Sequence, residues 1–156
     1  FSKKYNALAS KGTVFGESVL VLLPETYMNK SGASLKDISW SAKKAEKLIV
    51  VHDDLDLPVG RMKLMFNRGS GGHKGVESIH KTIKTEAYTR LKIGICPTTP
   101  SGKPKKPDLH SNPDFVISAF RPNELDEIKK LLKRASEALY VAVTAGRERS
   151  MNEFNG

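Results

Sequence analysis

The sequence is short of cysteine and of long apolar runs. Cys96 is the only cysteine in 156 residues, so no disulfide can form within the chain, which fits a reducing compartment. No apolar run approaches the ~20 residues that a membrane-spanning helix needs. The sequence also shows no internal repeat and no linker between domains, and its length suits one domain with its own core. We therefore expect a single domain over residues 1–156.

Negative charge is scarce relative to positive charge. The chain has 26 Lys and Arg against 17 Asp and Glu, which gives a formal net charge of +9. Such a surplus favours a polyanionic partner, with nucleic acid first and an acidic membrane surface second. Charge alone leaves a merely soluble basic protein equally open. Hydrophobic residues make up 38% and charged residues 28%, which is typical of a globular chain and not of a disordered one.

The apolar patterns predict strands in four places. Residues 17–25 and 47–52 are apolar runs that predict buried strands, and the second of them ends at a cluster of carboxylates. Residues 61–66 alternate, which predicts a strand with one face in water. A further strand is predicted over Thr89–Cys96, where Cys96 would be ordinary strand packing.

Helices are predicted between these strands. Leu35, Ile38 and Trp40 indicate one through the thirties, and a second is predicted after the glycine cluster. The clearest helix begins at Pro122 and ends near Gly146. The second helix has Val76, Ile79 and Ile83 at helical spacing, and the third has the stripe Leu125, Ile128, Leu132, Ala135 and Leu139. Residues 97–113 predict a mobile basic loop with Lys103, Lys105 and Lys106, and residues 115–120 suit either type. The alternation predicts an α/β sheet with helices on its faces.

Two predicted strands run into polar residues at their carboxyl ends, where α/β sheets collect ligands. If the two strands are neighbours, Asn29 and Asp53 share one crevice. An amide there can donate to and accept from a carbonyl or a water, and a carboxylate can hold a histidine in one tautomer. The alternatives are a helix cap at Asn29, and a solvated turn or a divalent metal site at Asp53, Asp54 and Asp56. His52 and Asp53 should not form a dyad, because neighbours on a strand point to opposite faces.

A glycine-rich basic turn, GSGGHKG at residues 69–75, precedes the second predicted helix. Between Arg61 and Lys92, eight lysines and arginines stand against two glutamates. Glycines let backbone approach a ligand closely, and amides at a helix start favour an anion. The stretch lacks the spacing of a Walker loop, and a plain flexible turn is equally open. His73 is a candidate base, although a phosphate contact or a structural role is more usual for a histidine in such a turn.

Several motifs together resemble the bacterial-type peptidyl-tRNA hydrolase family. They are LPETYMNKSG, VVHDDLDLPVGRMKL, GSGGHKGVESI, and RLKIGI followed by FVISAF, in the family's order and spacing from about Tyr5 to the last helix. The resemblance implies one α/β domain with a twisted mixed sheet and helices on both faces. It also implies cleavage of the ester between peptide and tRNA, a cytoplasmic monomer that binds peptidyl-tRNA, no cofactor, no metal and no membrane partner.

The resemblance assigns roles to individual positions. Asp53 matches the acid that orients the catalytic histidine, and Asn29 takes part in both catalysis and binding. The glycine turn belongs to the wall of the substrate channel. The positions that match substrate or tRNA contacts are Tyr27, Met28, Asn29, His73, Lys74, Lys92 and Lys103.

Two departures from the family pattern stand out. The family opens with a strand and loop of the type GLGNPG…Y…TRHN, which carries the catalytic histidine and has no counterpart in this sequence. None of the histidines at 52, 73, 80 and 110 falls at its position. We therefore expect a piece of a longer hydrolase that lacks its first strand and is nearly inactive by itself. The second departure is Lys74, where the family commonly has an asparagine.

A rival interpretation is a non-catalytic RNA-binding protein on the same fold, similar to the chloroplast splicing relatives of this family. Loss of the histidine segment and of the amide at Lys74 would suit it. Asn29 and Asp53 argue against it, because binding alone would not need both.

Overall fold

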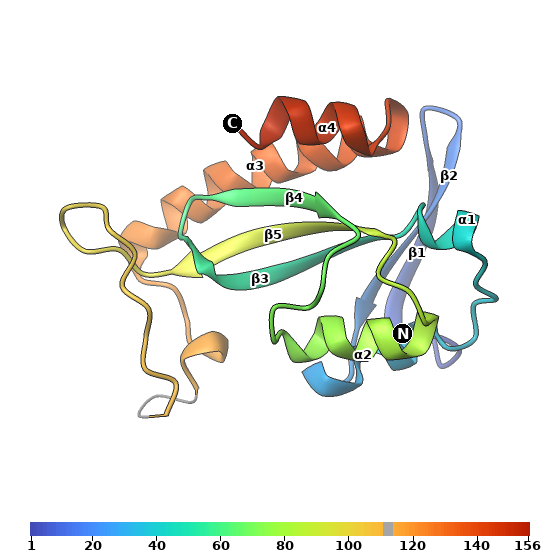
Figure 1. Ribbon diagram of the computed structural model, residues 1–156, viewed down its shortest axis with the longest axis horizontal. Helices are drawn as coiled ribbons and strands as arrows, with labels where there is room; N and C mark the ends of the chain where they lie inside the picture. The colour runs from blue at the N-terminus through green and yellow to red at the C-terminus, as the bar shows by residue number, and fades with distance from the viewer. Residues whose placement is uncertain (111–113) are drawn as a thin grey trace. The chain divides into compact units, whose positions relative to one another are not determined.

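The computed structural model describes residues 1–110 and 114–156 and divides them into two compact units. Unit 1 comprises Phe1–Ile49 and Phe66–Thr89, and unit 2 comprises Val50–Met65 and Arg90–Gly156. Together they hold strands and helices of an α/β protein (Figure 1). The expected single domain over residues 1–156 stays a prediction. The last residues of the predicted basic loop, 111–113, lie outside the described part of the chain.

Unit 1 begins with a β-hairpin. Strands β1 (Ala7–Val14) and β2 (Glu17–Pro24) pair antiparallel, from Ala7 opposite Pro24 to Val14 opposite Glu17. The two-residue turn between them has positive φ at both residues, which suits the twist of a hairpin. The strand predicted near residues 17–25 is confirmed, but its burial is wrong, because Val21 and Leu23 are 53% and 60% exposed. β1 was not predicted, since its sequence has no apolar run.

The helices of unit 1 are η1 (Met28–Leu35), a 3-10 helix, with α1 (Ala42–Ala45) and α2 (Lys74–Ile83). The helix predicted through the thirties is wrong, because the helical turns stop at Leu35 and the Trp40 ring instead donates to the Leu35 carbonyl at 3.0 Å. α2 is confirmed, with Val76, Ile79 and Ile83 buried as its spacing predicts. η1 and α2 pack closely against each other.

The sheet of unit 2 has the order β3-β5-β4, formed by β3 (Ile49–Pro58), β5 (Thr89–Cys96) and β4 (Met62–Phe66). β3 and β5 run in the same direction and β4 runs against them, so the sheet is mixed as expected (Figure 1). β4 and β5 confirm the prediction. β3 corrects it, because the strand does not stop near His52 but continues through the carboxylates to Pro58.

The connection from β3 to β4 crosses over β5. The two strands lie on opposite sides of β5, yet only residues 59–61 join them. The crossing occurs at Gly94, where a Cβ would collide with the carbonyl oxygen of Pro58. A glycine at this position therefore lets the short connection pass.

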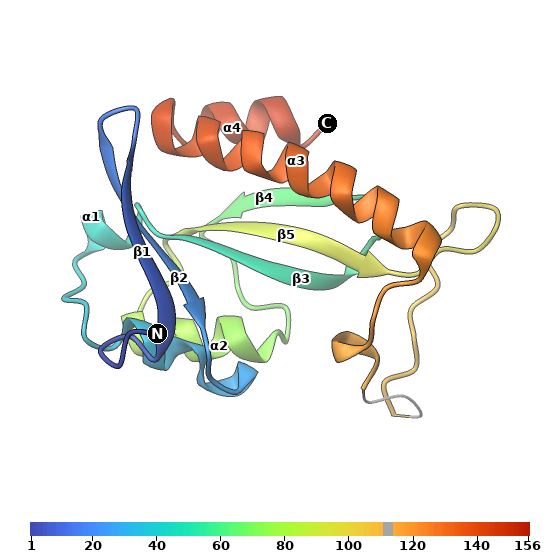
Figure 2. The same ribbon diagram turned by 180° about the vertical axis from the view of Figure 1, so that it is seen from behind.

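Unit 2 continues with η2 (Phe115–Ile117), α3 (Pro122–Thr144) and α4 (Arg147–Phe154). Both views place α3 and α4 side by side, on the same side of the three-stranded sheet (Figure 2). The cluster of buried residues at this face is Leu64, Leu91, Ala135 and Ala138, with Met62, Ile93, Leu139, Met151 and Phe154 packed around it. Helices on both faces of the sheet stay a prediction.

The long helix was placed correctly, and the residues it buries were predicted only in part: Ala135 is buried and Leu139 packs against the core as predicted. The predicted stripe included Leu125 and Leu132, which are 42% and 52% exposed, whereas Leu131, Ala135 and Ala138 are buried. The buried face therefore combines one leucine with two small alanines, and two other leucines are exposed. Gly146 ends the helix region as predicted, with φ of 93°, and α4 follows it unpredicted. Among the described residues, none of the helices has the length and apolar character needed to cross a membrane.

Candidate functional site

The glycine turn of unit 1 leads directly into α2. Gly71 and Gly72 have φ of 63° and 84°, and the Gly72 amide donates to the Ser70 hydroxyl at 3.1 Å. His73 is the N-cap of α2, and its Nδ1 accepts from the Val76 amide at 3.2 Å. Of the roles considered for His73, the structure therefore supports a structural one: its ring stabilises the start of the helix.

An open groove of about 390 Å³ lies between η1 and α2 within unit 1. Asn29 lines it from η1, and the remaining lining residues come from α2. They are Lys74, Glu77, Ser78, Lys81 and Thr82. The groove brings together one amide, two hydroxyls, two lysines and the Glu77 carboxylate, a polar set in which positive charge exceeds negative charge by one.

Three consecutive residues at the start of η1 have exposed side chains. Tyr27 and Met28 are 81% and 54% exposed, and Asn29 is exposed as well. The alternative interpretation of Asn29 as a helix cap is wrong, because Tyr27 is the N-cap of η1 and gives no side-chain cap. Met28 packs over α2, since a Cβ on Gly75 would lie 2.6 Å from its sulfur.

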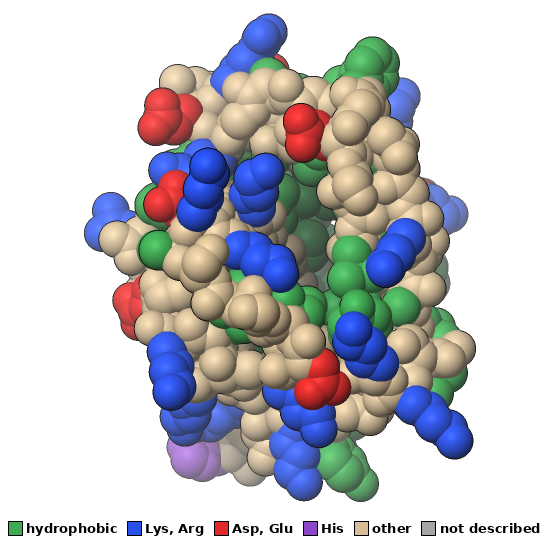
Figure 3. All heavy atoms as spheres, turned by 90° about the vertical axis from the view of Figure 1, so that its right-hand side faces the viewer, with side chains coloured by type: hydrophobic (Ala, Val, Ile, Leu, Met, Phe, Trp, Pro, Cys, Tyr) green, Lys and Arg blue, Asp and Glu red, His purple; other side chains and the backbone are tan. Residues whose placement is uncertain are grey.

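Lys74 is the first residue of α2 and is 71% exposed at its side chain. Its ammonium lies 3.5 Å from the Glu77 carboxylate, one turn along the helix. A lysine in the first turn is unfavourable, because the N-terminus of a helix carries partial positive charge. In the view that has α1 and the β1–β2 hairpin in front, lysine and arginine side chains are more numerous than carboxylates (Figure 3).

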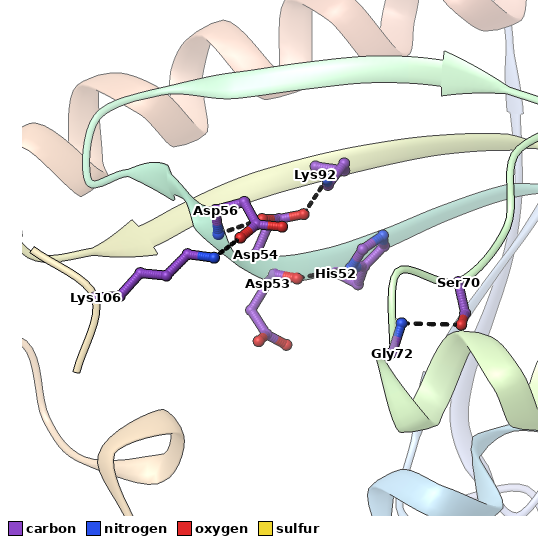
Figure 4. A network of polar contacts seen from close by, with 8 residues as sticks. All are labelled: His52, Asp53, Asp54, Asp56, Ser70, Gly72, Lys92 and Lys106. Atoms are coloured by element: carbon purple, nitrogen blue, oxygen red, sulfur yellow. Dashed lines mark hydrogen bonds and ion pairs between the residues drawn. The ribbon is translucent and has the colours of Figure 1, made fainter. Parts of the chain in front are cut away.

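Three carboxylates of unit 2, those of Asp53, Asp54 and Asp56, lie close together on β3. Asp54 forms an ion pair with Lys92, and Asp56 forms one with Lys106. The Asp56 amide also donates to the Asp54 carboxylate at 2.6 Å. The carboxylate of Asp53 points away from both ion pairs (Figure 4), as strand alternation requires.

The His52 ring contacts the backbone of the next residue. Its Nδ1 lies 2.7 Å from the Asp53 carbonyl oxygen, so this contact is no His–carboxylate dyad, in line with the expectation. The alternative of a metal site at the three β3 carboxylates finds no support, because two of them face lysine ammonium groups. The described residues contain no cluster of three or more His, Cys, Asp or Glu that could hold a metal ion.

The two lysines predicted as tRNA contacts on this unit differ in their surroundings. Lys92 is only 17% exposed at its side chain and pairs with Asp54, which is 9% exposed. Burial lowers the pKa of the Lys92 ammonium, since the charged form loses solvation. Lys103 is exposed in the loop after β5, within a tight turn. Lys92 is thus held inside the unit, and Lys103 is open to a partner.

The predicted crevice rested on two strands being neighbours. β2 pairs with β1, and β3 pairs with β5, so the two strands are not neighbours in a sheet, and a crevice shared by Asn29 and Asp53 stays a prediction. Asp53 also lies within β3 and not beyond its end. The sequence prediction missed the groove residues Ser78, Lys81 and Thr82, although the spacing of Lys74, Ser78 and Lys81 already indicated one polar helix face.

The mixed sheet and its helices place this protein in the α/β class, and a basic turn and a polar groove are its candidate binding features. The family model for peptidyl-tRNA hydrolase matches residues 1–156, and the chain belongs to that family. The peptidyl-tRNA hydrolase of Carboxydothermus hydrogenoformans is 38% identical over 154 residues, which cover 98% of this chain and 78% of that protein. The one of Aquifex aeolicus is 40% identical over 146 residues, 93% of this chain and 72% of that protein.

Solved structures agree with the sequence comparison. The crystal structure of peptidyl-tRNA hydrolase from Acinetobacter baumannii is similar with a TM-score of 0.84 at 28% identity. The match covers 100% of this chain and 76% of that one. The resemblance found in the motifs is therefore confirmed, for the family and for its α/β fold.

Proposed function

We propose that this protein hydrolyses the ester bond of peptidyl-tRNA and releases the peptide and free tRNA. The observation that carries the proposal is the family match along residues 1–156, supported by relatives named for this activity at 38% and 40% identity. We further propose that the protein acts in the cytoplasm, because its substrate arises in translation. The resemblance to the family also leads us to propose that it is a monomer and needs no metal or cofactor.

The proposed chemistry is attack of an activated water on the ester carbonyl. Asp53 would orient a histidine base and stabilise its charged form, and the Asn29 amide would hold the carbonyl or the water. Exposed Tyr27 and Met28 would contact the substrate beside the Asn29 groove. His73 would act indirectly, by fixing the start of α2, and Lys74 would bind a phosphate.

tRNA binding is proposed for exposed lysines. Lys103 suits this role because it stands open in a basic loop. Lys92 is the weaker candidate of the two predicted from sequence, since it is largely buried against Asp54.

We also propose that the 156-residue chain alone is a poor catalyst, because three of its four histidines are engaged in other surroundings and His110 lies exposed in the loop after β5. His73 caps α2, and the His52 ring contacts backbone. The His80 ring lies 3.5 Å from the Glu86 carboxylate and edge-on to Tyr88. A positioned base typically contributes ~10²–10⁴-fold to a rate.

The test compares this chain with a chimera that carries the N-terminal segment of the Carboxydothermus hydrogenoformans relative ahead of Phe1. We expect the chimera to turn over peptidyl-tRNA roughly 10²–10⁴-fold faster. Asp53→Asn in the chimera should lower kcat and leave tRNA affinity unchanged, because the base matters as the transition state forms. Equal rates for chain and chimera would show that a histidine of the chain serves as base. A chimera that binds tRNA but never hydrolyses it would support the RNA-binding alternative.

A further inference from the structure

The basic loop after β5 is an organised turn. The Thr99 amide donates to the Lys103 carbonyl and the Gly102 amide donates to the Thr99 carbonyl, both at 2.8 Å. The Lys105 amide donates to the Pro97 carbonyl at 2.8 Å, and Thr98 forms a bridge with Pro104. The turn is therefore closed at its base, and Lys106 follows immediately.

Lys106 reaches back from this base to β3. Its ammonium contacts the Asp56 carboxylate, and both side chains stay largely in water, 65% and 62% exposed. The hydrogen bond and the charge of Asp56 raise the pKa of Lys106, so the ammonium stays protonated at neutral pH. Figure 4 shows the pair at the edge of the network, with Lys106 extended toward Asp56.

The second ion pair of β3 has a different character. Asp54 and Lys92 are 9% and 17% exposed, so separating them would leave a desolvated charge without compensation. An exposed ion pair contributes little and is screened by salt, so its partner can be exchanged. Of the two lysines that β3 holds, only Lys106 can change partners at small cost.

We propose that Lys106 is a contact for an RNA phosphate, and that Asp56 occupies its ammonium until RNA binds. The inference rests on the proposed function, because RNA is the anion that the hydrolase would recognise. A phosphate oxygen replaces the Asp56 carboxylate as the partner of Lys106, and the lysine keeps its charge throughout. Asp56 thereby weakens RNA binding and reduces its dependence on salt.

The test measures binding of deacylated tRNA to the 156-residue chain across a series of KCl concentrations. Asp56→Asn should tighten binding roughly two- to fivefold, the range expected for an exposed ion pair. It should also make the salt dependence steeper, by up to about one phosphate contact. Lys106→Gln should weaken binding, and Asp56→Asn should have no further effect in the Lys106→Gln background.

A matched control separates this effect from the change in net charge. Asp126 lies 3.6 Å from Lys129 on α3 of the same unit, with both side chains about three-quarters exposed. Asp126→Asn removes an equal charge from another exposed pair, and we expect a smaller effect than at Asp56. Equal tightening by both variants would show a general charge effect and overturn the proposal. Weaker binding of Asp56→Asn would also overturn it, since Asp56 would then position Lys106 for RNA.

The outcomes separate this inference from the proposed function. Hydrolysis by the chimera, with tRNA binding unchanged by Asp56→Asn, would refute the exchange at Lys106 and keep the hydrolase. Tighter binding by Asp56→Asn, without hydrolysis by the chimera, would keep the exchange and refute the hydrolase. If the unsubstituted chain fails to bind tRNA, the Lys106 contact is refuted.

Discussion

At Gly94 the backbone of the β3–β4 connection passes directly over β5. The hydrogen of the glycine leaves space for the carbonyl oxygens of Leu57 and Pro58, both of which a Cβ would overlap. These are backbone atoms, which cannot move aside as easily as the end of a flexible side chain. One residue without a side chain thus permits a three-residue connection across the strand.

We predict that Gly94→Ala destabilises the protein by about 1–3 kcal/mol, the usual cost of overpacking a core, or by more if the sheet cannot adjust. Gly12→Ala is the matched control, because a Cβ there would meet no atom within 4 Å and φ is not positive. The midpoint of urea unfolding should fall for Gly94→Ala and stay nearly constant for Gly12→Ala. Similar midpoints for both variants would contradict the crossing at Gly94.

Single residues were predicted unevenly, and the reason lies in the kind of information each role needs. His73 was recognised as a possible structural residue, yet its capping bond to Val76 depends on where α2 begins. Lys92 matched a tRNA contact by its place in a motif, but the motif does not show that Asp54 stands beside it. Roles that depend on where a helix begins, or on a partner far along the chain, could not be derived from sequence spacing.

At the scale of elements, the end of α4 is bound to β4 by the Asn155 side-chain amide, which pairs with the β4 backbone as a neighbouring strand would. Asn155 follows α4; its Oδ1 accepts from the Leu64 amide at 2.7 Å, and its Nδ2 donates to the Leu64 carbonyl at 2.9 Å. Leu64 belongs to β4, which lies at the edge of the order β3-β5-β4. The amide satisfies both backbone groups of Leu64 at that edge.

We predict that Asn155→Ala lowers the free energy of unfolding by about 1–3 kcal/mol, the cost of leaving partly buried polar groups unsatisfied. Asn152→Ala provides the control, because Asn152 is exposed on α4 and alanine favours a helix. Urea unfolding should show a lower midpoint for Asn155→Ala with an unchanged slope. Faster hydrogen exchange at the Leu64 amide should accompany it. If the two variants unfold alike, the Asn155 clamp has no measurable effect.

Elements with a strong apolar pattern were predicted well, and those without one were not. β5 matches its prediction, and α2 buries the predicted residues. α4, with the sequence RERSMNEF, has few apolar residues and depends on packing against α3, so its sequence gave no signal. β3 was cut short because acidic residues usually mark loops, whereas Lys92 and Lys106 neutralise two of them within the strand.

At the scale of the whole molecule, a net charge of +9 favours association with a polyanion and makes it sensitive to salt. This property could be derived from composition. Which strands are neighbours could not be derived from composition or from the local pattern, because strand pairing is decided by tertiary packing. The expectation that β2 and β3 are neighbours was therefore wrong. Charge therefore indicates the kind of partner, and the local geometry of individual lysines indicates where it is contacted.

Lys74 contributes both to the net charge and to a local site, because its side chain lines the Asn29 groove. A lysine can donate to a phosphate but cannot accept a hydrogen bond, so it cannot orient a water as an amide does. We predict that Lys74→Asn weakens tRNA binding and flattens its salt dependence by about one phosphate contact, while kcat of the chimera stays similar or rises slightly. Stability should not fall, because Lys74 begins α2 and a cation there is unfavourable.

Lys11→Asn, on exposed β1, removes the same charge away from the groove and serves as the control. Affinity for deacylated tRNA should be measured across a KCl series for both variants, together with single-turnover hydrolysis by the corresponding chimeras. Because a specific phosphate contact acts locally and net charge acts at a distance, we expect the slope to change more for Lys74→Asn than for Lys11→Asn. Identical slopes would make Lys74 one more surface charge. An unchanged slope with a collapsed kcat would instead assign Lys74 to the chemistry of ester cleavage.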